Sequence, residues 1–185
     1  MVKPQSKIFF VFFFALVLTL SLFLVSASHK SASYKYMIAT GFLEEHGPDI
    51  AMARNGDTIE LMGEGTFTTN PKTITGEGTF VHKNAEGEVI GTGKWAATKL
   101  ISFQSYGDGT PQGLPAEFEG GRALVKVILD PDGIGPSFEG TLKITCLLGD
   151  KIPKKAEEGI QLAVRGIPIH FNKEVGGETV FIRES

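Results

Sequence analysis

Apolar residues alternate with polar ones along most of this chain, so hydrophobic side chains recur at every second position more often than at every third or fourth. That period is the period of a β-strand, in which successive side chains point to opposite faces. Turn-forming residues return at intervals of about 10 to 15 positions. The pattern predicts an all-β protein.

The alternation is clearest in two segments that share the order Phe-Glu-Gly, strand, aspartate. The first places on one face Ala123, Val125, Val127 and Leu129, and the second places on one face Leu142, Ile144, Cys146 and Leu148. The residues Asp130–Gly133 between them predict a hairpin turn. Further strands are predicted over 73–81, 89–103, 160–164, 167–171 and 179–182.

A Gly-x-Gly pair followed by Thr or Lys and an aromatic residue occurs three times, as GEGTF at Gly63, GEGTF at Gly76 and GTGKW at Gly91. A phosphate-binding loop needs a following helix and a GK[ST] ending or a third glycine, and these are missing here. Glycine inside a strand marks a bulge, a bend or a close approach of two backbones. Repeated in successive strands, it predicts the corners that curl an antiparallel sheet into a barrel.

The predicted fold is therefore a small antiparallel β-barrel of about eight to ten strands, with a two-sheet β-sandwich as the alternative. This architecture resembles that of secreted small barrels of the lipocalin and dirigent types. A shared architecture does not by itself fix a function.

The chain opens with Lys3 and Lys7, followed by the uncharged apolar run Ile8–Val25. A basic start, an apolar run and small residues ending at Ala27 predict a signal peptide over residues 1–27, and hence a secreted or extracytoplasmic protein. The run is close to the minimum length of a membrane-spanning helix, so an uncleaved anchor over residues 8–25 is the alternative. Residues 28–36 are predicted as a flexible polar lead-in and residues 37–185 as a single β domain.

The net charge is −3, and the lysines and arginines are scattered along the chain. Nucleic acids and anionic membrane surfaces bind concentrated basic patches, so neither is an expected partner; contact with a membrane is expected only through an uncleaved N-terminal segment. Cys146 is the single cysteine, which excludes an intramolecular disulfide. No cofactor motif is present, and we expect no cofactor.

Two acidic segments could suggest a metal site. The first is Glu44–Asp49, where a metal would require His46 to converge with His82 or His170. Adjacent side chains of an extended segment point to opposite sides, so a solvated loop is favoured there. The second, Asp130–Gly133, begins like a calcium loop but lacks the later oxygen ligands, so a hairpin turn is favoured and no metal is expected.

Signals of catalysis are weak. Cys146 lies between Ile144 and Leu148 on an apolar face, where it is expected to be a small core residue. The chain has no G-x-S-x-G elbow, no H-E-x-x-H motif and no distinctive Ser/His/Asp arrangement. We therefore lean toward a non-catalytic protein.

The remaining feature is a group of aromatic residues in strands that are expected to be neighbours. Trp95 and Phe103 are separated by an even number of positions, so a regular strand places both on one face. The candidate ligand-binding residues are Trp95, Phe103, Tyr106, Phe67 and Phe80. Inside a small barrel they would form either a packed core or the wall of a cavity.

The leading hypothesis is a secreted, non-catalytic β-barrel that binds a small apolar or amphipathic ligand. One alternative is an extracellular surface or wall interaction module, which predicts a solid core and an exposed apolar patch. A second is a cavity enzyme of the isomerase or cyclase type, which predicts that His82, His170 or a glutamate is buried and faces the cavity with a perturbed pKa.

Overall fold

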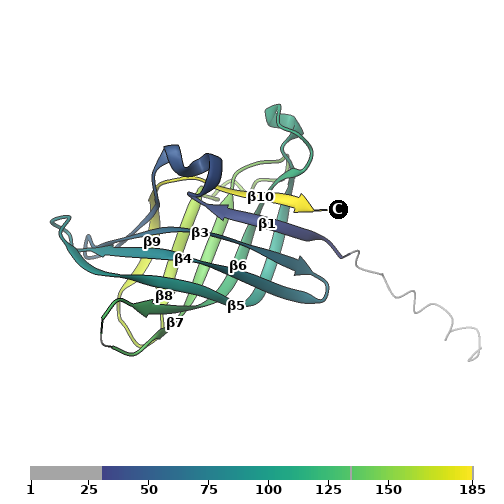
Figure 1. Cartoon of the computed structure of the whole chain (residues 1–185). Coiled ribbons are helices and arrows are strands. Elements are labelled where there is room, and N and C mark those ends of the chain that lie inside the picture. The colour runs from purple at the N-terminus through teal and green to yellow at the C-terminus, as the bar shows by residue number, and fades with distance from the viewer. Residues whose placement is uncertain (1–30, 134, 185) are drawn as a thin grey trace, which may run out of the picture. The chain divides into compact units, whose positions relative to one another are not determined.

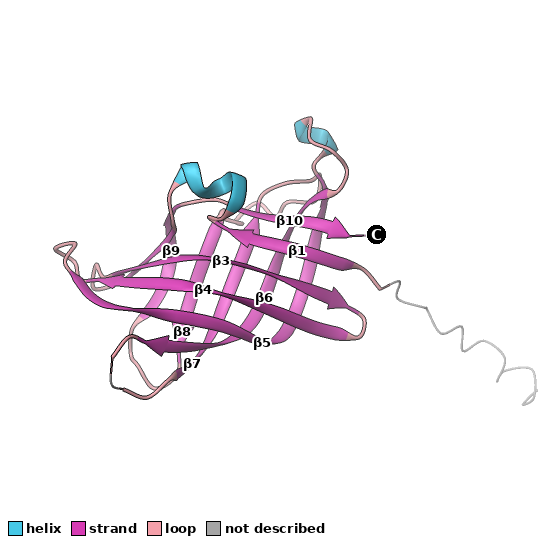
Figure 2. Cartoon of the chain, viewed as in Figure 1, coloured by secondary structure: helices cyan, strands magenta, loops and turns pink. Residues whose placement is uncertain are grey.

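A computed structural model describes residues 31–133 and 135–184 of the chain. Figures 1 and 2 show that strands are the predominant secondary structure of this part, with two short helices and connecting loops. Its elements are β1 (Ser33–Ile38), η1 (Gly41–His46), β2 (Asp49–Ala53), β3 (Thr58–Thr69), β4 (Lys72–Lys83), β5 (Val89–Asp108), η2 (Thr110–Gln112), β6 (Phe118–Pro131), β7 (Phe138–Cys146), β8 (Gly159–Val164), β9 (His170–Gly176) and β10 (Thr179–Glu184). The predicted signal peptide lies outside the described residues. Within them, no helix has the length and apolar character needed to cross a membrane.

The strands form one antiparallel sheet of ten strands in the order β1-β10-β6-β5-β4-β3-β2-β9-β8-β7. An additional pairing of β6 with β7 closes a ring of eight strands, from β2 to β9. β1 lies between β3 and β10, and β10 in turn reaches β6. The predicted all-β antiparallel fold is confirmed, and the described residues form one compact unit.

The predicted inward faces of β6 and β7 are confirmed by burial. Ala123, Val125, Val127 and Leu129 of β6 are each at most 3% exposed, and Leu142, Ile144 and Cys146 of β7 are equally buried. Leu148, predicted on the same face, lies beyond the end of β7 and is half-buried. Because β6 and β7 pair along nine residue pairs, these faces form a continuous wall of the interior. The hydrophobic effect of this burial drives the ring to close.

The repeated glycines lie in rows that cross neighbouring strands, and each row combines a large ring with at least one glycine. Four of the six repeated glycines lie in the rows Gly63–Gly78–Trp95, Leu61–Phe80–Gly93 and Ile59–His82–Gly91. The other two form the row Tyr36–Gly65–Gly76, which crosses β1, β3 and β4. Residues directly opposite each other in paired strands point to the same face. A ring at one position can therefore lie across the bare backbone of the glycine beside it.

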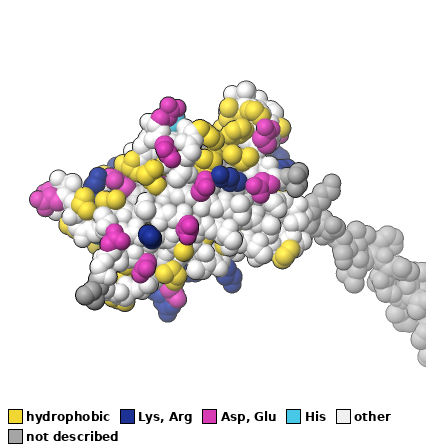
Figure 3. Space-filling model, viewed as in Figure 1, with side chains coloured by type: hydrophobic (Ala, Val, Ile, Leu, Met, Phe, Trp, Pro, Cys, Tyr) yellow, Lys and Arg dark blue, Asp and Glu magenta, His cyan; other side chains and the backbone are white. Residues whose placement is uncertain are grey.

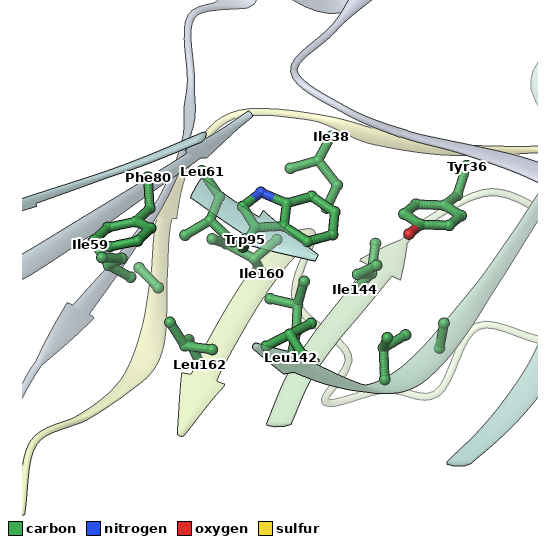
Figure 4. Close-up of a cluster of buried hydrophobic side chains, with 14 of the residues drawn as sticks. Tyr36, Ile38, Ile59, Leu61, Phe80, Trp95, Leu142, Ile144, Ile160 and Leu162 are labelled. Carbon is green, nitrogen blue, oxygen red and sulfur yellow. The ribbon is translucent and has the colours of Figure 1, made fainter. Parts of the chain in front are cut away.

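Trp95 and Tyr36 show why these positions are glycine. A Cβ placed on Gly78 would lie 2.7 Å from Nε1 of Trp95, and a Cβ placed on Gly65 would lie 2.7 Å from the hydroxyl of Tyr36. Figure 4 shows both aromatic side chains among the buried residues of the interior. The Gly-x-Gly repeats are thus a packing device of the barrel wall, in agreement with the close backbone approach expected from the sequence.

Strand β5 is long and irregular. Its pairing with β6 shifts register between Ala97 and Lys99, again between Leu100 and Ser102, and once more beyond Ser105. Each shift moves the inward face by one residue, as a β-bulge does. Two shifts separate Trp95 from Phe103 and cancel, so both residues pack in the core as the sequence predicts.

Two sequence-based boundaries were wrong. Residues 28–36 were expected to be a polar lead-in, but β1 begins at Ser33, and Tyr34 and Tyr36 are 3% and 0% exposed. The strand expected over 167–171 begins only at His170. The preceding residues Ile167 and Ile169 instead pack against the core from a loop that contains Pro168, which has no N–H to give to a sheet.

Candidate functional site

The structure distributes the five predicted aromatic residues along the interior. Phe67 and Phe103 meet, with ring centroids 4.9 Å apart. Trp95 is enclosed in the core and donates a hydrogen bond from Nε1 to the carbonyl of Met62, 3.0 Å away. Tyr106 is 1% exposed, and Phe80 lies on the row between Trp95 and His82. Of the five, the structure places only Phe67 and Phe103 ring against ring.

Phe67 and Phe103 belong to a packed aromatic cluster. Tyr34 lies 5.0 Å from Phe67 and 4.7 Å from Phe103 between ring centroids, and Phe181 lies 5.1 Å from Phe103. These are contact distances for aromatic rings. The hydroxyl of Tyr34 donates to Oε1 of Glu119 at 3.1 Å. Burial, followed by the Glu119 charge and that hydrogen bond, raises the pKa of Tyr34 to about 12. This part of the interior is solid core.

An apolar cavity of about 230 Å³ lies at one end of the eight-stranded ring. We call it the mouth pocket, because the loops β2–β3, β4–β5, β6–β7 and β8–β9 gather at this end. Its lining consists of Ile59, Phe80, His82, Ile90, Gly91, Leu129, Pro131, Phe138, Leu162, Val164, Ile167, Ile169 and Phe171. Of the five aromatic residues predicted to bind a ligand, only Phe80 lines the mouth pocket.

His82 is the one ionisable side chain in this lining. Its Nε2 lies 3.3 Å from Oδ2 of Asp57, and its ring meets Phe171 edge-on with centroids 5.3 Å apart. The two side chains are 24% and 12% exposed. Both residues are therefore largely shielded from water, which strengthens the electrostatic interaction between them.

A tight turn holds Asp57 in place. The backbone N–H of Ala53 donates to the carbonyl of Asp57 at 2.8 Å, and the N–H of Gly56 donates to the carbonyl of Ala53 at 3.1 Å. Gly56 has φ +93°, which favours glycine. The side chain of Asn55 accepts from the N–H of Asp57 at 3.3 Å. The carboxylate of Asp57 is thus fixed beside His82 by local backbone structure.

The contact between Asp57 and His82 determines which further hydrogen bonds the His82 ring can form. An ionised carboxylate accepts hydrogen bonds only, so Nε2 of a neutral His82 must carry the proton that Asp57 accepts. The other ring nitrogen, Nδ1, is then an acceptor, and among the described residues it has no partner. Such a nitrogen can accept a hydrogen bond from a hydroxyl group or remove its proton.

A second hollow, of about 400 Å³, lies at the opposite end of the ring, beside η1. We call it the η1 groove, and Figure 3 shows hydrophobic side chains gathered in this region. Its lining consists of Phe42, Leu43, Leu114, Phe118, Cys146, Leu147, Leu148, Glu158, Glu178, Thr179 and Val180. Phe42 and Leu114 are 53% and 39% exposed. The η1 groove is larger than the mouth pocket, and its lining includes the carboxylates of Glu158 and Glu178 beside its apolar side chains.

Asp49 corrects the expectation that Glu44–Asp49 is a solvated loop. Residues 41–46 do form the short helix η1, but Asp49 begins β2 with 0% of its surface exposed. Neither of its carboxylate oxygens has a hydrogen-bond partner among the described residues. Burial first, and then the charges of Glu158, Glu174 and Glu178, raise the pKa of Asp49 to about 8.

Two further carboxylates, Glu158 and Glu174, lie near Asp49. Glu158 accepts hydrogen bonds from the backbone N–H groups of Leu147 and Thr179 and from the Thr179 hydroxyl. Glu174 is approached by Nζ of Lys143 at 3.0 Å. Burial raises the pKa of Glu174 to about 7, although Lys143 opposes this shift. Three carboxylates thus share one buried region, and the oxygens of both Asp49 and Glu174 lack a hydrogen bond there, although Glu174 has the Lys143 ion pair.

The other candidate residues have structural roles. Ser137 donates to Asp130 at 3.0 Å and Thr92 donates to Asp132 at 2.7 Å, which fixes the predicted hairpin turn. Cys146 is 2% exposed, and burial raises the pKa of its thiol far above the ordinary value. Within residues 31–133 and 135–184, no group of three or more His, Cys, Asp or Glu residues is placed to hold a metal ion.

Comparison of the chain with models of known protein families, with curated proteins and with solved structures finds no match.

Proposed function

We propose that this protein is a secreted β-barrel that binds one small apolar molecule in the mouth pocket. The observation that carries this proposal is the lining, which is apolar except for His82 and is contributed by strands on all sides of the ring. Binding sites for small molecules combine such a surface with a few placed polar groups. Secretion rests on Lys3, Lys7 and the apolar run Ile8–Val25.

The size of the pocket limits the ligand. A cavity of about 150 Å³ lined by aliphatic and aromatic side chains holds benzene. The mouth pocket, at about 230 Å³, therefore suits a molecule with one ring and short substituents. Larger apolar ligands would have to displace the loop that carries Ile167 and Ile169.

A cavity enzyme is a second candidate, because His82 and Asp57 form a histidine–carboxylate pair at an apolar pocket. This arrangement orients an imidazole as a general base. An isomerase or cyclase acting on the bound molecule would use it. Incubation of the protein with a candidate ligand, followed by chromatography of the recovered ligand, distinguishes catalysis from simple binding.

Native mass spectrometry of the protein purified from its own host tests the binding proposal. The expected result is a small organic mass that is lost on denaturation. The matched variant is Gly91→Leu: Gly91 pairs with His82 on the pocket face, and only Cβ of His82, 3.8 Å away, lies near the site of a new Cβ. The added side chain should fill the pocket and abolish the bound mass.

Val89→Leu is the control, because Val89 lies two residues away on the same strand, is 56% exposed and is outside the lining. This variant should retain the ligand. A ligand that persists in Gly91→Leu, or that is lost equally from Val89→Leu, would contradict binding in the mouth pocket.

A further inference from the structure

His82 is the polar side chain that lines the mouth pocket. Nε2 of His82 is occupied by Asp57, and Nδ1 of the same ring makes no hydrogen bond with the described residues. A polar atom that a ligand covers without pairing it costs free energy, so the bound molecule should supply a donor. The ligand therefore needs one donor group on an otherwise apolar body.

The negative charge of Asp57 limits which hydrogen-bond donor group the ligand can carry. Asp57 lies beside His82 with a 12% exposed side chain, and the lining contains no lysine or arginine. A ligand carboxylate would bring a second negative charge into this weakly screened region, which is unfavourable. A neutral hydroxyl group meets the requirement without adding charge.

The apolar walls favour a ring as the body of the ligand. Phe80, Phe138 and Phe171 all line the pocket. Aromatic rings pack well against one another in offset or edge-to-face geometry. The volume of about 230 Å³ is close to that needed for a single substituted ring.

We infer that the ligand of the mouth pocket is a single-ring phenol whose hydroxyl donates a hydrogen bond to Nδ1 of His82. This inference rests on the proposed function of apolar-ligand binding. Asp57 is a positioning residue, because it holds the proton on Nε2 and so leaves Nδ1 free to accept.

NMR titrations of the whole secreted domain with p-cresol and with p-xylene test this inference, because they give the affinity for each probe. The two probes have nearly the same shape, and p-xylene carries a methyl group where p-cresol carries the hydroxyl. The unmodified protein should bind p-cresol roughly 10-fold more tightly, since an acceptor that the ligand covers without pairing it is costly. His82→Leu should reverse the preference, and His46→Leu, at the opposite end of the barrel, should leave it unchanged.

A second measurement needs no substitution. The nitrogen NMR shifts of the His82 ring distinguish the two neutral tautomers and should place the proton on Nε2. Addition of p-cresol should shift the Nδ1 resonance, whereas p-xylene should shift only the neighbouring apolar signals. Asp57→Asn should redistribute the proton between the two nitrogens and remove the preference for p-cresol, an effect that a purely structural role of Asp57 would not produce.

The outcomes separate the two proposals. Preference for p-cresol with an Nδ1 shift supports the inference. Equal binding of both probes at the pocket, unaffected by His82→Leu, overturns the phenol assignment while leaving apolar-ligand binding intact. Binding of neither probe overturns both proposals.

Discussion

The indole of Trp95 donates its N–H to the backbone carbonyl of Met62, 3.0 Å away, and in doing so it lies across the glycine pair Gly63 and Gly78 of the two neighbouring strands. A buried indole needs such a partner for its N–H. This contact joins strand β5 to strand β3 over the bare backbone of β4. It gives the glycine repeats a measurable role in stability.

Gly78→Ala is expected to destabilise the protein by about 1 to 3 kcal/mol, the usual cost of overpacking a filled core. The new Cβ would lie 2.7 Å from Nε1 of Trp95 and would also meet the carbonyl of Met62. The free energy of unfolding in urea measures the effect.

Gly91→Ala, in the third Gly-x-Gly pair, is the matched control. Its new Cβ would meet only Cβ of His82, at 3.8 Å, so the change should be neutral or stabilising by about 0.5 kcal/mol. Equal effects of the two substitutions would mean that the ring contacts are not the reason for the glycines.

The sequence predicts the fold well where alternation is regular. In β6 and β7 every second residue from Ala123 and from Leu142 is buried, because both strands keep one register with each other. The core-facing residues of β5 are harder to predict, since the inward face changes at each register shift. The sequence does not predict β1, although Tyr34-Lys35-Tyr36 follows the alternation. The segment is short and contains lysine and serine, which is typical of a polar lead-in when the strands that pair with it are not known.

Less of the candidate site than of the fold can be predicted from the sequence. The sequence indicates His82 as a candidate to face a cavity but does not indicate Asp57, because the two residues meet only through the pairing of β3 with β4. The Asn55-Gly56-Asp57 turn was the available signal for a fixed carboxylate. Asp49 follows Pro48 in a run of charged residues, and nothing in that run distinguishes a buried aspartate from an exposed one.

The buried carboxylate of Asp49 predicts that stability falls as pH rises. Its pKa is raised from 3.8 to about 8 in the folded protein. Between these values the folded state holds a proton that the unfolded state has released, so stability decreases with pH across this window. Asp49→Asn removes the group, and its stability relative to the unmodified protein should increase by more than about 1.4 kcal/mol between about pH 5 and about pH 9.

Urea unfolding at the two pH values measures this difference for both proteins. Glu86→Gln, at an exposed position in the β4–β5 turn, is the control and should follow the unmodified protein at both pH values. Parallel pH profiles for Asp49→Asn and the unmodified protein would show that Asp49 does not titrate in this window.

Lys143→Met is expected to destabilise the protein in a pH-dependent way. Lys143 is the cation beside Glu174, whose side chain is 3% exposed. Without it, an ionised Glu174 is left buried and unpaired, which costs about 3 kcal/mol. The loss should be largest above the raised pKa of about 7 and should shrink as pH falls and Glu174 becomes neutral.

Thermal unfolding of Lys143→Met at several pH values tests this prediction, and two further variants serve as comparisons. Lys35→Met breaks a pair with Glu64 whose side chains are 38% and 52% exposed, and it should cost less than about 1 kcal/mol. The double variant Lys143→Met/Glu174→Gln should recover much of the lost stability. A pH-independent loss in Lys143→Met would mean that lost packing, and not charge, is responsible.

Cys146 is expected to resist alkylation in the folded protein. The thiol is 2% exposed, and burial, with a contribution from the Glu158 charge, disfavours the reactive thiolate. Iodoacetamide should therefore react only through opening of the barrel, and the reaction followed by mass spectrometry reports the population of the open state. Gly78→Ala should accelerate it roughly 5- to 150-fold, in proportion to the 1 to 3 kcal/mol lost. Fast alkylation of the unmodified protein, or no acceleration in Gly78→Ala, would show that Cys146 is reached from the η1 groove without opening of the core.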